Sequence, residues 1–237
     1  FDKTGIVEFA KVLENLGCEI ISSGGTRTAL TNSSINSIEV EKISGNPEAF
    51  GGRMKTISFN IESAILFDRD KDKEEAKKLK INPIDLVVCN FYPFRKKLDE
   101  NSSLETLVEN IDIGGPTMIR AAAKNYRHVA VIVDPADYLL VINELQKNNG
   151  SLSFSTRSYL MRKAFNYTAD YDALIASAMD EKHGEKSVRM AFDSCKTLRY
   201  GENPHQVGQV LRERESKISL YDMKVLHGKE ISYNNMV

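Results

Sequence analysis

Segments resembling short buried strands alternate with amphipathic helical segments along the first two-thirds of the chain, and this alternation constrains the fold most strongly. Residues 3–16 carry apolar side chains at spacings of three and four, which predicts a helix, and residues 18–22 then predict a strand. Further strands are predicted at 64–67, 84–89 and 129–133, with helices from about residue 26 and at 71–80, 103–110, 116–125 and 138–147. Strands that alternate with helices favour right-handed crossovers, so we predict an α/β domain with a central parallel sheet flanked by helices.

A second domain is expected after a long helix. Residues 156–181 keep three-to-four spacing and predict this helix, and a polar stretch follows it at 181–187. From there onward the sequence is typical of strands and turns, in a segment of α+β type. We therefore predict domains at 1–189 and 190–237.

Both ends of the chain look like internal positions of a longer protein. The chain starts at Phe1 without a methionine, and it stops inside a polar, hairpin-like run at 231–237. We therefore expect the sequence to be a piece of a longer protein, with the second domain truncated.

The charge balance and the cysteines exclude several classes of function. The chain has 32 Lys plus Arg and 33 Asp plus Glu, a formal net charge of −1, which argues against binding nucleic acid or a membrane through bulk electrostatics. No apolar stretch approaches the roughly 18 residues of a membrane span. The three cysteines are far apart, which excludes a disulfide framework and indicates a reducing, cytoplasmic compartment. The four histidines lack metal-ligand spacing, so no metal site is predicted.

The turn Ser23-Gly24-Gly25-Thr26 follows a predicted strand and opens a predicted helix. Its glycines let backbone N–H groups converge, and its hydroxyls add donors, so the turn suits a phosphate. Lys3 is expected beside it. The alternative interpretation is an ordinary tight turn, with Lys3 as a solvated residue at a helix start.

A second glycine-rich turn, Gly51 to Thr56, contains two cations. Arg53 can hold a phosphate or carboxylate through two hydrogen bonds, whereas Lys55 is a compact charge that can stabilise an oxyanion. The alternative is an exposed basic loop.

The run Cys89 to Phe94 leaves a predicted strand at its carboxyl end, where ligands bind in open α/β sheets. Asn90 offers a donor and an acceptor for a base or carboxamide edge, and Tyr92 offers a phenol. We interpret Phe91 and Phe94 as packing residues.

The run Ile111 to Asn125 has a carboxylate near its start, Asp112, and a lysine near its end, Lys124. Asp112 stands near a helix start, where an Asp is often a cap. Lys124 follows three alanines, and a lysine held among small apolar residues loses hydration, which lowers its pKa and suits proton transfer. The alternative for Lys124 is a charge that interacts with the helix dipole.

These motifs closely resemble those of the bifunctional AICAR transformylase/IMP cyclohydrolase family. The matching segments are Asp2–Gly5, Ser23–Thr26, Gly51–Thr56, Asn90–Phe94, Asp112–Asn125, Leu198–Gln206 and Gly228–Asn235. The resemblance covers essentially the whole chain, and the string Leu198–Gln206 makes it very specific. It implies a methylglyoxal-synthase-like fold and an IMP cyclohydrolase, which closes the ring of formylated aminoimidazole carboxamide ribotide (FAICAR) to give IMP and water.

The resemblance also implies roles for individual residues. Lys3, Ser23, Gly24, Gly25 and Thr26 would hold the 5′-phosphate, Arg53, Lys55, Thr56, Cys89 and Asn90 would line the nucleotide, and Asp112, Ile113 and Gly114 would hold the base. The catalytic groups would be Lys124 for proton transfer, Lys55 and Tyr92 for stabilising the formyl oxygen, and Asp112. No metal or cofactor is implied for this step.

For the full-length protein, the resemblance implies a homodimer that also formylates AICAR with formyl-tetrahydrofolate. Arg199 and Tyr200 would contact AICAR, but the Lys-His pair for formyl transfer has no counterpart here, so this chain alone is expected to lack that activity. The sequence departs from the family at Ile57–Phe59, where Leu-His-Pro is usual, at Glu62–Ala64, where His-Gly-Gly is usual, and at Phe1, where a serine is frequent. The alternatives of the same fold are a methylglyoxal synthase-type lyase and a nucleotide-sensing regulatory domain.

Overall fold

Two pairs of short parallel strands lie within a largely helical unit. The computed structural model describes residues 1–214 and 218–236, and the chain divides into two compact units, Phe1–Lys182 and His183–Val237. In the first unit, β1 (Ile21–Ser22) pairs with β2 (Ile38–Glu39), and β3 (Leu86–Val88) pairs with β4 (Ala130–Ile132), both in parallel. The α/β prediction is confirmed, although the described strands form two separate pairs instead of one continuous sheet.

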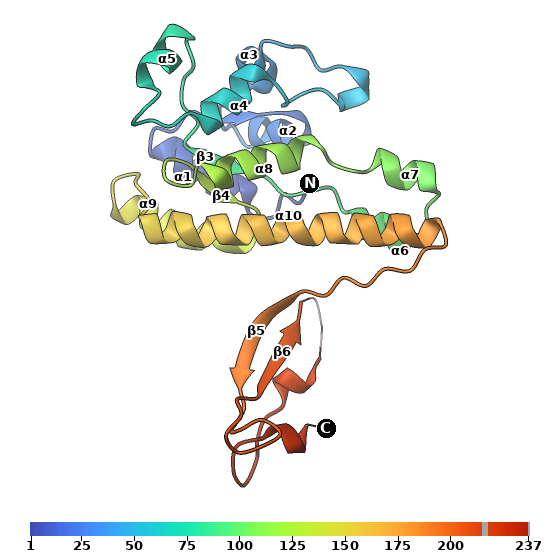
Figure 1. The fold of residues 1–237 in the computed structure, drawn as a ribbon. Helices are drawn as coiled ribbons and strands as arrows, with labels where there is room; N and C mark the ends of the chain where they lie inside the picture. The colour runs from blue at the N-terminus through green and yellow to red at the C-terminus, as the bar shows by residue number, and fades with distance from the viewer. Residues whose placement is uncertain (215–217, 237) are drawn as a thin grey trace. The chain divides into compact units, whose positions relative to one another are not determined.

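Ten α-helices surround these strands in the described residues. They are α1 (Ile6–Asn15), α2 (Gly24–Asn32), α3 (Val40–Ser44), α4 (Phe59–Leu66), α5 (Lys73–Lys78), α6 (Phe94–Asp99), α7 (Leu104–Glu109), α8 (Gly114–Lys124), α9 (Tyr138–Lys147) and α10 (Phe154–Lys182). The 3₁₀ turns η1 (Phe50–Gly52) and η2 (Pro135–Asp137) also belong to this unit. Figure 1 shows α10 running along one side of the unit, where it packs against α8 and β4.

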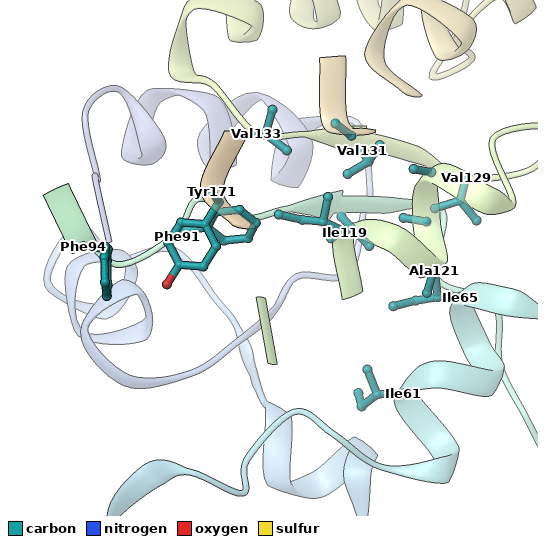
Figure 2. Close-up of a cluster of buried hydrophobic side chains, with 14 of the residues drawn as sticks. Ile61, Ile65, Phe91, Phe94, Ile119, Ala121, Val129, Val131, Val133 and Tyr171 are labelled. Atoms are coloured by element: carbon teal, nitrogen blue, oxygen red, sulfur yellow. The ribbon is translucent and has the colours of Figure 1, made fainter. Parts of the chain in front are cut away.

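The strand β4 is buried on both faces, and its side chains alternate between two clusters. Val131 points into the main cluster together with Ile119 of α8, as Figure 2 shows. Ala130 and Ile132 belong to a second cluster, with Phe9 of α1. This alternation follows from the two-residue period of a strand, and it places helices on both sides of β4.

Aromatic side chains attach α10 to the segment that follows β3. Phe91 packs on Tyr167 and Tyr171 with ring-centroid distances of 4.5 and 4.4 Å, and Figure 2 shows the Phe91 and Tyr171 rings together. Both hydroxyls accept backbone N–H groups, that of Tyr167 from Phe91 at 3.0 Å and that of Tyr171 from Asp112 at 2.9 Å. The prediction that Phe91 and Phe94 serve in packing is confirmed, since they are 5% and 1% exposed.

The strand predicted at 64–67 is wrong, because Ala64 to Leu66 lie in the helix α4. Ser58 caps this helix, and its Oγ accepts the backbone N–H of Ile61 at 3.1 Å. A short apolar run suits a buried helix as well as a strand, so its composition alone did not distinguish the two.

The second unit contains β5 (Phe192–Thr197) and β6 (Gln209–Glu213), an antiparallel pair, with η3 (Leu220–Asp222). The hairpin-like run predicted at 231–237 is instead the 3₁₀ turn η4 (Tyr233–Asn235), as far as residue 236; residue 237 lies outside the described residues. Ser232 stabilises this turn through a capping box with Asn235. Among the described helices, none combines the length and the apolar character needed to cross a bilayer.

Replacing Ile119 tests the main cluster. Ile119 is fully buried, so Ile119→Ala should leave a cavity and lower the free energy of unfolding by about 2–5 kcal/mol in urea denaturation. Leu139→Ala is the control, because Leu139 is 67% exposed on α9 and its replacement should cost less than about 0.5 kcal/mol. Equal effects of the two changes would contradict this account of the core.

Candidate functional site

The start of α2 presents free backbone donors. Gly24, Gly25 and Thr26 form the first turn, and the first intrahelical hydrogen bond is donated by the N–H of Arg27 to Ser23 O at 3.3 Å. The N–H groups of the three preceding residues therefore have no partner within the helix. In the described structure the Ser23 hydroxyl does not cap this helix. The helix dipole adds positive potential, so this turn can bind an anion.

Two lysines lie beside this turn. Lys55 Nζ is 3.5 Å from the position that a Cβ on Gly24 would take, and Lys3 Nζ is 3.5 Å from the corresponding position on Gly25. Gly24 has a φ of +51°, a backbone conformation that favours glycine. The predicted phosphate turn is thus brought together with Lys3 and Lys55.

Lys55 already forms an ion pair with a carboxylate of the same chain. Its ammonium lies 2.6 Å from Glu48 Oε2, and the Lys55 side chain is only 20% exposed. Ser23, Gly24, Lys55 and Glu48 share the wall of one cavity of about 530 Å³. The remaining lining residues are Arg27, Thr28, Thr31, Asn32, Glu39 and Glu41. The cavity therefore combines an anion-binding helix start with internal acids.

Arg53 is directed to a different partner. Its Nε donates to Glu109 Oε1 of α7 at 3.3 Å, and a second guanidinium nitrogen pairs with the other carboxylate oxygen. The pKa of Arg53 is raised and that of Glu109 lowered, in each case mainly by this hydrogen bond. Since Arg53 is 70% exposed and Glu109 58%, the pair contributes little to stability. The structure does not bring Arg53 to the α2 turn.

The segment around Lys55 also meets the start of α8. A Cβ on Gly114 would stand 2.7 Å from Thr56 Oγ1, so only glycine permits this close approach. Asp112 accepts the backbone N–H of Gly115 at 2.9 Å and so caps α8. Burial nevertheless raises the pKa of the Asp112 carboxyl. Asp112 therefore acts as a cap and is also a partly desolvated acid, while Ile113 beside it is 61% exposed.

The segment after β3 is tied to the first residues of the chain. Asn90 Oδ1 accepts the backbone nitrogens of Phe1 and Asp2 at 2.7 and 2.9 Å, and Asn90 Nδ2 donates to Asp2 O at 2.9 Å. The Asn90 amide thus holds the segment that carries Lys3 instead of standing free for a base. Tyr92 is 55% exposed, with its ring centroid 6.2 Å from that of Phe1.

Cys89 is a neutral group. Its burial, and secondarily the nearby charge of Asp112, raise the pKa of the thiol to about 12. A thiol with this pKa stays protonated at neutral pH and is a poor nucleophile there.

Lys124 lies at the other end of α8. The 11 residues of this helix rise about 15 Å, so Lys124 stands far from Gly114. The three alanines before Lys124 are buried, but Lys124 itself is exposed. The prediction that its side chain loses hydration is therefore wrong. It does share a second cavity, of about 640 Å³, with Asp112 and Ile113.

Sequence reasoning missed three acids. Glu48 pairs with Lys55 and Glu109 pairs with Arg53, while Glu62 lines the second cavity together with Lys124. Glu62 Oε1 is buried without a hydrogen-bond partner in the described structure, and burial raises the pKa of this carboxyl. The one available signal was that Glu62 stands in the segment that departs from the family pattern.

Among the described residues, Asp68, Asp70 and His128 form a group of possible metal ligands. His128 Nε2 lies 3.5 Å from Asp68 Oδ1 and 3.8 Å from Asp70 Oδ2. Asp68 Oδ1 also accepts the backbone N–H groups of Asp70 and Lys71, at 2.9 and 3.3 Å. We interpret the group as a structural link between the loop after α4 and the turn before β4.

Arg199 and Tyr200 lie in the second unit and contact each other. The Arg199 guanidinium stands 4.8 Å from the centroid of the Tyr200 ring and donates to its hydroxyl at 3.0 Å. Hydrogen bonds from Ser232 and Arg199 lower the pKa of Tyr200. The two side chains are thus held as a pair.

Two family models together cover nearly the whole chain. One is described as "MGS-like domain" and matches residues 5–117, and the other is described as "AICARFT/IMPCHase bienzyme" and matches residues 122–237. The chain belongs to this bienzyme family. Its first unit accordingly has the MGS-like fold predicted from the sequence.

Known relatives agree with this assignment. The chain is 48% identical to the bifunctional purine biosynthesis protein PurH of Persephonella marina, over 100% of this chain and 47% of that protein. It is 44% identical to PurH of Caldicellulosiruptor saccharolyticus, over 100% of this chain and 48% of that protein. The chain thus spans about half the length of these relatives. The crystal structure of ForH matches with a TM-score of 0.66 and 31% identity, over 75% of this chain and 94% of that one.

The different surroundings of Lys55 and Arg53 predict different contributions to anion binding. Lys55→Ala should weaken the binding of inorganic phosphate at least about tenfold, because it removes a half-buried cation beside the α2 turn. Arg53→Ala should change it less than about threefold, because that guanidinium is exposed and paired with Glu109. Isothermal titration calorimetry measures both, and a larger loss in Arg53→Ala would show that Arg53 turns toward the ligand.

Proposed function

We propose that the first unit is an IMP cyclohydrolase that converts FAICAR to IMP and water. The observation that carries the proposal is a continuous series of contacts among segments far apart in the sequence. Lys3 and Lys55 flank the α2 turn, Thr56 meets Gly114, and Asn90 fastens the segment that carries Lys3. Membership of a family whose relatives are named bifunctional purine biosynthesis proteins supports the assignment.

The α2 turn suits the ligand's 5′-phosphate. The N–H groups of Gly24, Gly25 and Thr26, with the Ser23 hydroxyl, offer four donors to one anion. Lys3 adds a charge on the same side. Hydrogen bonds to a charged group are about twice as strong as neutral ones, so this turn supplies much of the affinity.

The reaction needs little beyond positioning and charge stabilisation. The carboxamide nitrogen attacks the formyl carbon of the same molecule, a C–N bond forms, and the former formyl oxygen leaves as water after taking up protons. Because both reacting groups belong to one ligand, a site that holds the reactive conformer removes most of the entropic barrier. Lys55 and Tyr92 would stabilise the oxygen as the carbon becomes tetrahedral.

Proton transfer is assigned to Asp112 and Lys124. Asp112 is a partly buried acid beside the start of α8, and Lys124 lines the same second cavity as Asp112 and Ile113. A base held at Ile113 and Gly114 would lie at one end of this cavity. Lys124 stands at the far end of α8, so its side chain must extend along this cavity to reach the reacting atoms.

The whole protein is proposed to do more than this chain. By family, it would be a cytoplasmic homodimer that formylates AICAR with formyl-tetrahydrofolate before the cyclisation. Arg199 and Tyr200 would contact AICAR in that second reaction. Their mutual contact in the second unit keeps both side chains oriented.

Incubation of the chain with FAICAR tests the proposal directly. We expect IMP to form, detected by its ultraviolet absorbance, without added metal or cofactor. Dihydroxyacetone phosphate serves as the second substrate, because a methylglyoxal synthase-type lyase would release its phosphate. Binding of nucleotide with neither reaction would favour a nucleotide-sensing domain and contradict the enzymatic proposal.

Replacing Lys124 tests its assignment to proton transfer. Lys124→Ala should slow cyclisation about 10²-fold and leave IMP affinity within about threefold, if Lys124 moves a proton in the transition state. Lys147→Ala is the matched control, since Lys147 also stands in the last turn of a helix, α9. Equal cyclisation rates in the two variants would contradict this assignment and favour the alternative, in which Lys124 only interacts with the helix dipole.

A further inference from the structure

We propose that Glu48 is a specificity-determining residue, an internal anion that competes with the ligand for Lys55. The inference rests on the proposed nucleotide site and concerns a residue that the family resemblance did not assign. Its basis is the 2.6 Å contact between Glu48 Oε2 and Lys55 Nζ in the cavity at the α2 turn.

The position of the carboxylate is the first argument. Lys55 Nζ stands beside Gly24, where an anion bound at the α2 turn would also meet it. Glu48 and Ser23 line the same cavity of about 530 Å³. The carboxylate is therefore bound where the same ammonium would stabilise a ligand oxygen. Lys55 has three N–H donors, but two anions at one ammonium repel each other, so the carboxylate and the ligand compete for it.

The backbone around Glu48 is the second argument. The segment contains Gly45, Gly51 and Gly52, all with positive φ, and Gly52 has a φ of +94°. A Cβ on Gly52 would stand 3.1 Å from Glu48 Oε1, so the absence of a side chain there leaves space for the carboxylate. Glu48 itself is 46% exposed, which gives it room to turn toward solvent when a ligand takes Lys55.

The charge of the cavity is the third argument. Glu39 and Glu41 also line it, but Glu39 is paired with Arg27 at 3.1 Å. Glu48 is the acid that pairs with Lys55, one of the two lysines beside the α2 turn. A dianionic phosphate must therefore displace Glu48 or bind against its charge. A ligand that offers Lys55 a strong hydrogen-bond acceptor, such as a phosphate, can displace Glu48 and bind. A ligand with a weaker acceptor cannot displace it and binds poorly.

Titration of three proteins tests this competition. Glu48→Gln should bind IMP about tenfold more tightly than the unaltered chain, because the amide no longer competes as a charge. Glu41→Gln is the control, because it removes one negative charge from the same cavity, while the ion pair of Lys55 is with Glu48. This change should alter the affinity for IMP less than about threefold. In FAICAR cyclisation, Glu48→Gln should lower KM and leave kcat unchanged or reduced by slower product release.

A purely structural role for Glu48 predicts the opposite sign. If Glu48 only positions Lys55, then Glu48→Gln frees the lysine side chain and weakens IMP binding. Either weaker binding or an unchanged affinity for IMP would overturn the proposal. The double variant Glu48→Gln/Lys55→Ala should lose the gain, since the coupling runs through Lys55. Inorganic phosphate is titrated in parallel, and tighter phosphate binding by Glu48→Gln would support the competition for Lys55. Failure of the unaltered chain to cyclise FAICAR would count against the proposed function alone.

Discussion

The unsatisfied backbone donors at the start of α2 are the constraint around which the candidate site is arranged. Gly24, Gly25 and Thr26 cannot pair their N–H groups within the helix, and the dipole concentrates positive potential there. Lys3 and Lys55 add two cations to the same turn. Such a concentration of positive charge requires an anion or internal acids. The structure supplies one such acid, Glu48, and leaves the helix start available to a ligand.

Rigid packing elsewhere holds this arrangement. The contacts of Phe91 with Tyr167 and Tyr171 fix the segment after β3 on α10, and the same tyrosines hold the backbone of Phe91 and Asp112. The segment after β3 and the start of α8 are thus positioned by one helix. In the glycine-rich segment with Lys55, by contrast, Phe50 and Met54 are exposed, which suits a part of the site that must exchange partners.

Much of the fold followed from periodicity, and the limits of that reasoning are physical. The helix predicted at 138–147 has the bounds of α9, and the strand at 129–133 contains β4, because long or fully buried segments carry a strong pattern. The run at 64–67 failed because four apolar residues fit either structure. The ion pair of Arg53 with Glu109 joins residues 56 positions apart, and a single sequence does not reveal such tertiary partners.

The central claim is that the α2 turn, Lys55 and the start of α8 form one nucleotide site. A crystal structure of the chain with IMP tests it most directly. The account predicts the phosphate within hydrogen-bond distance of the backbone nitrogens of Gly24, Gly25 and Thr26, with Lys55 released from Glu48. A phosphate bound beside Lys124, with the contact between Lys55 and Glu48 intact, would contradict it.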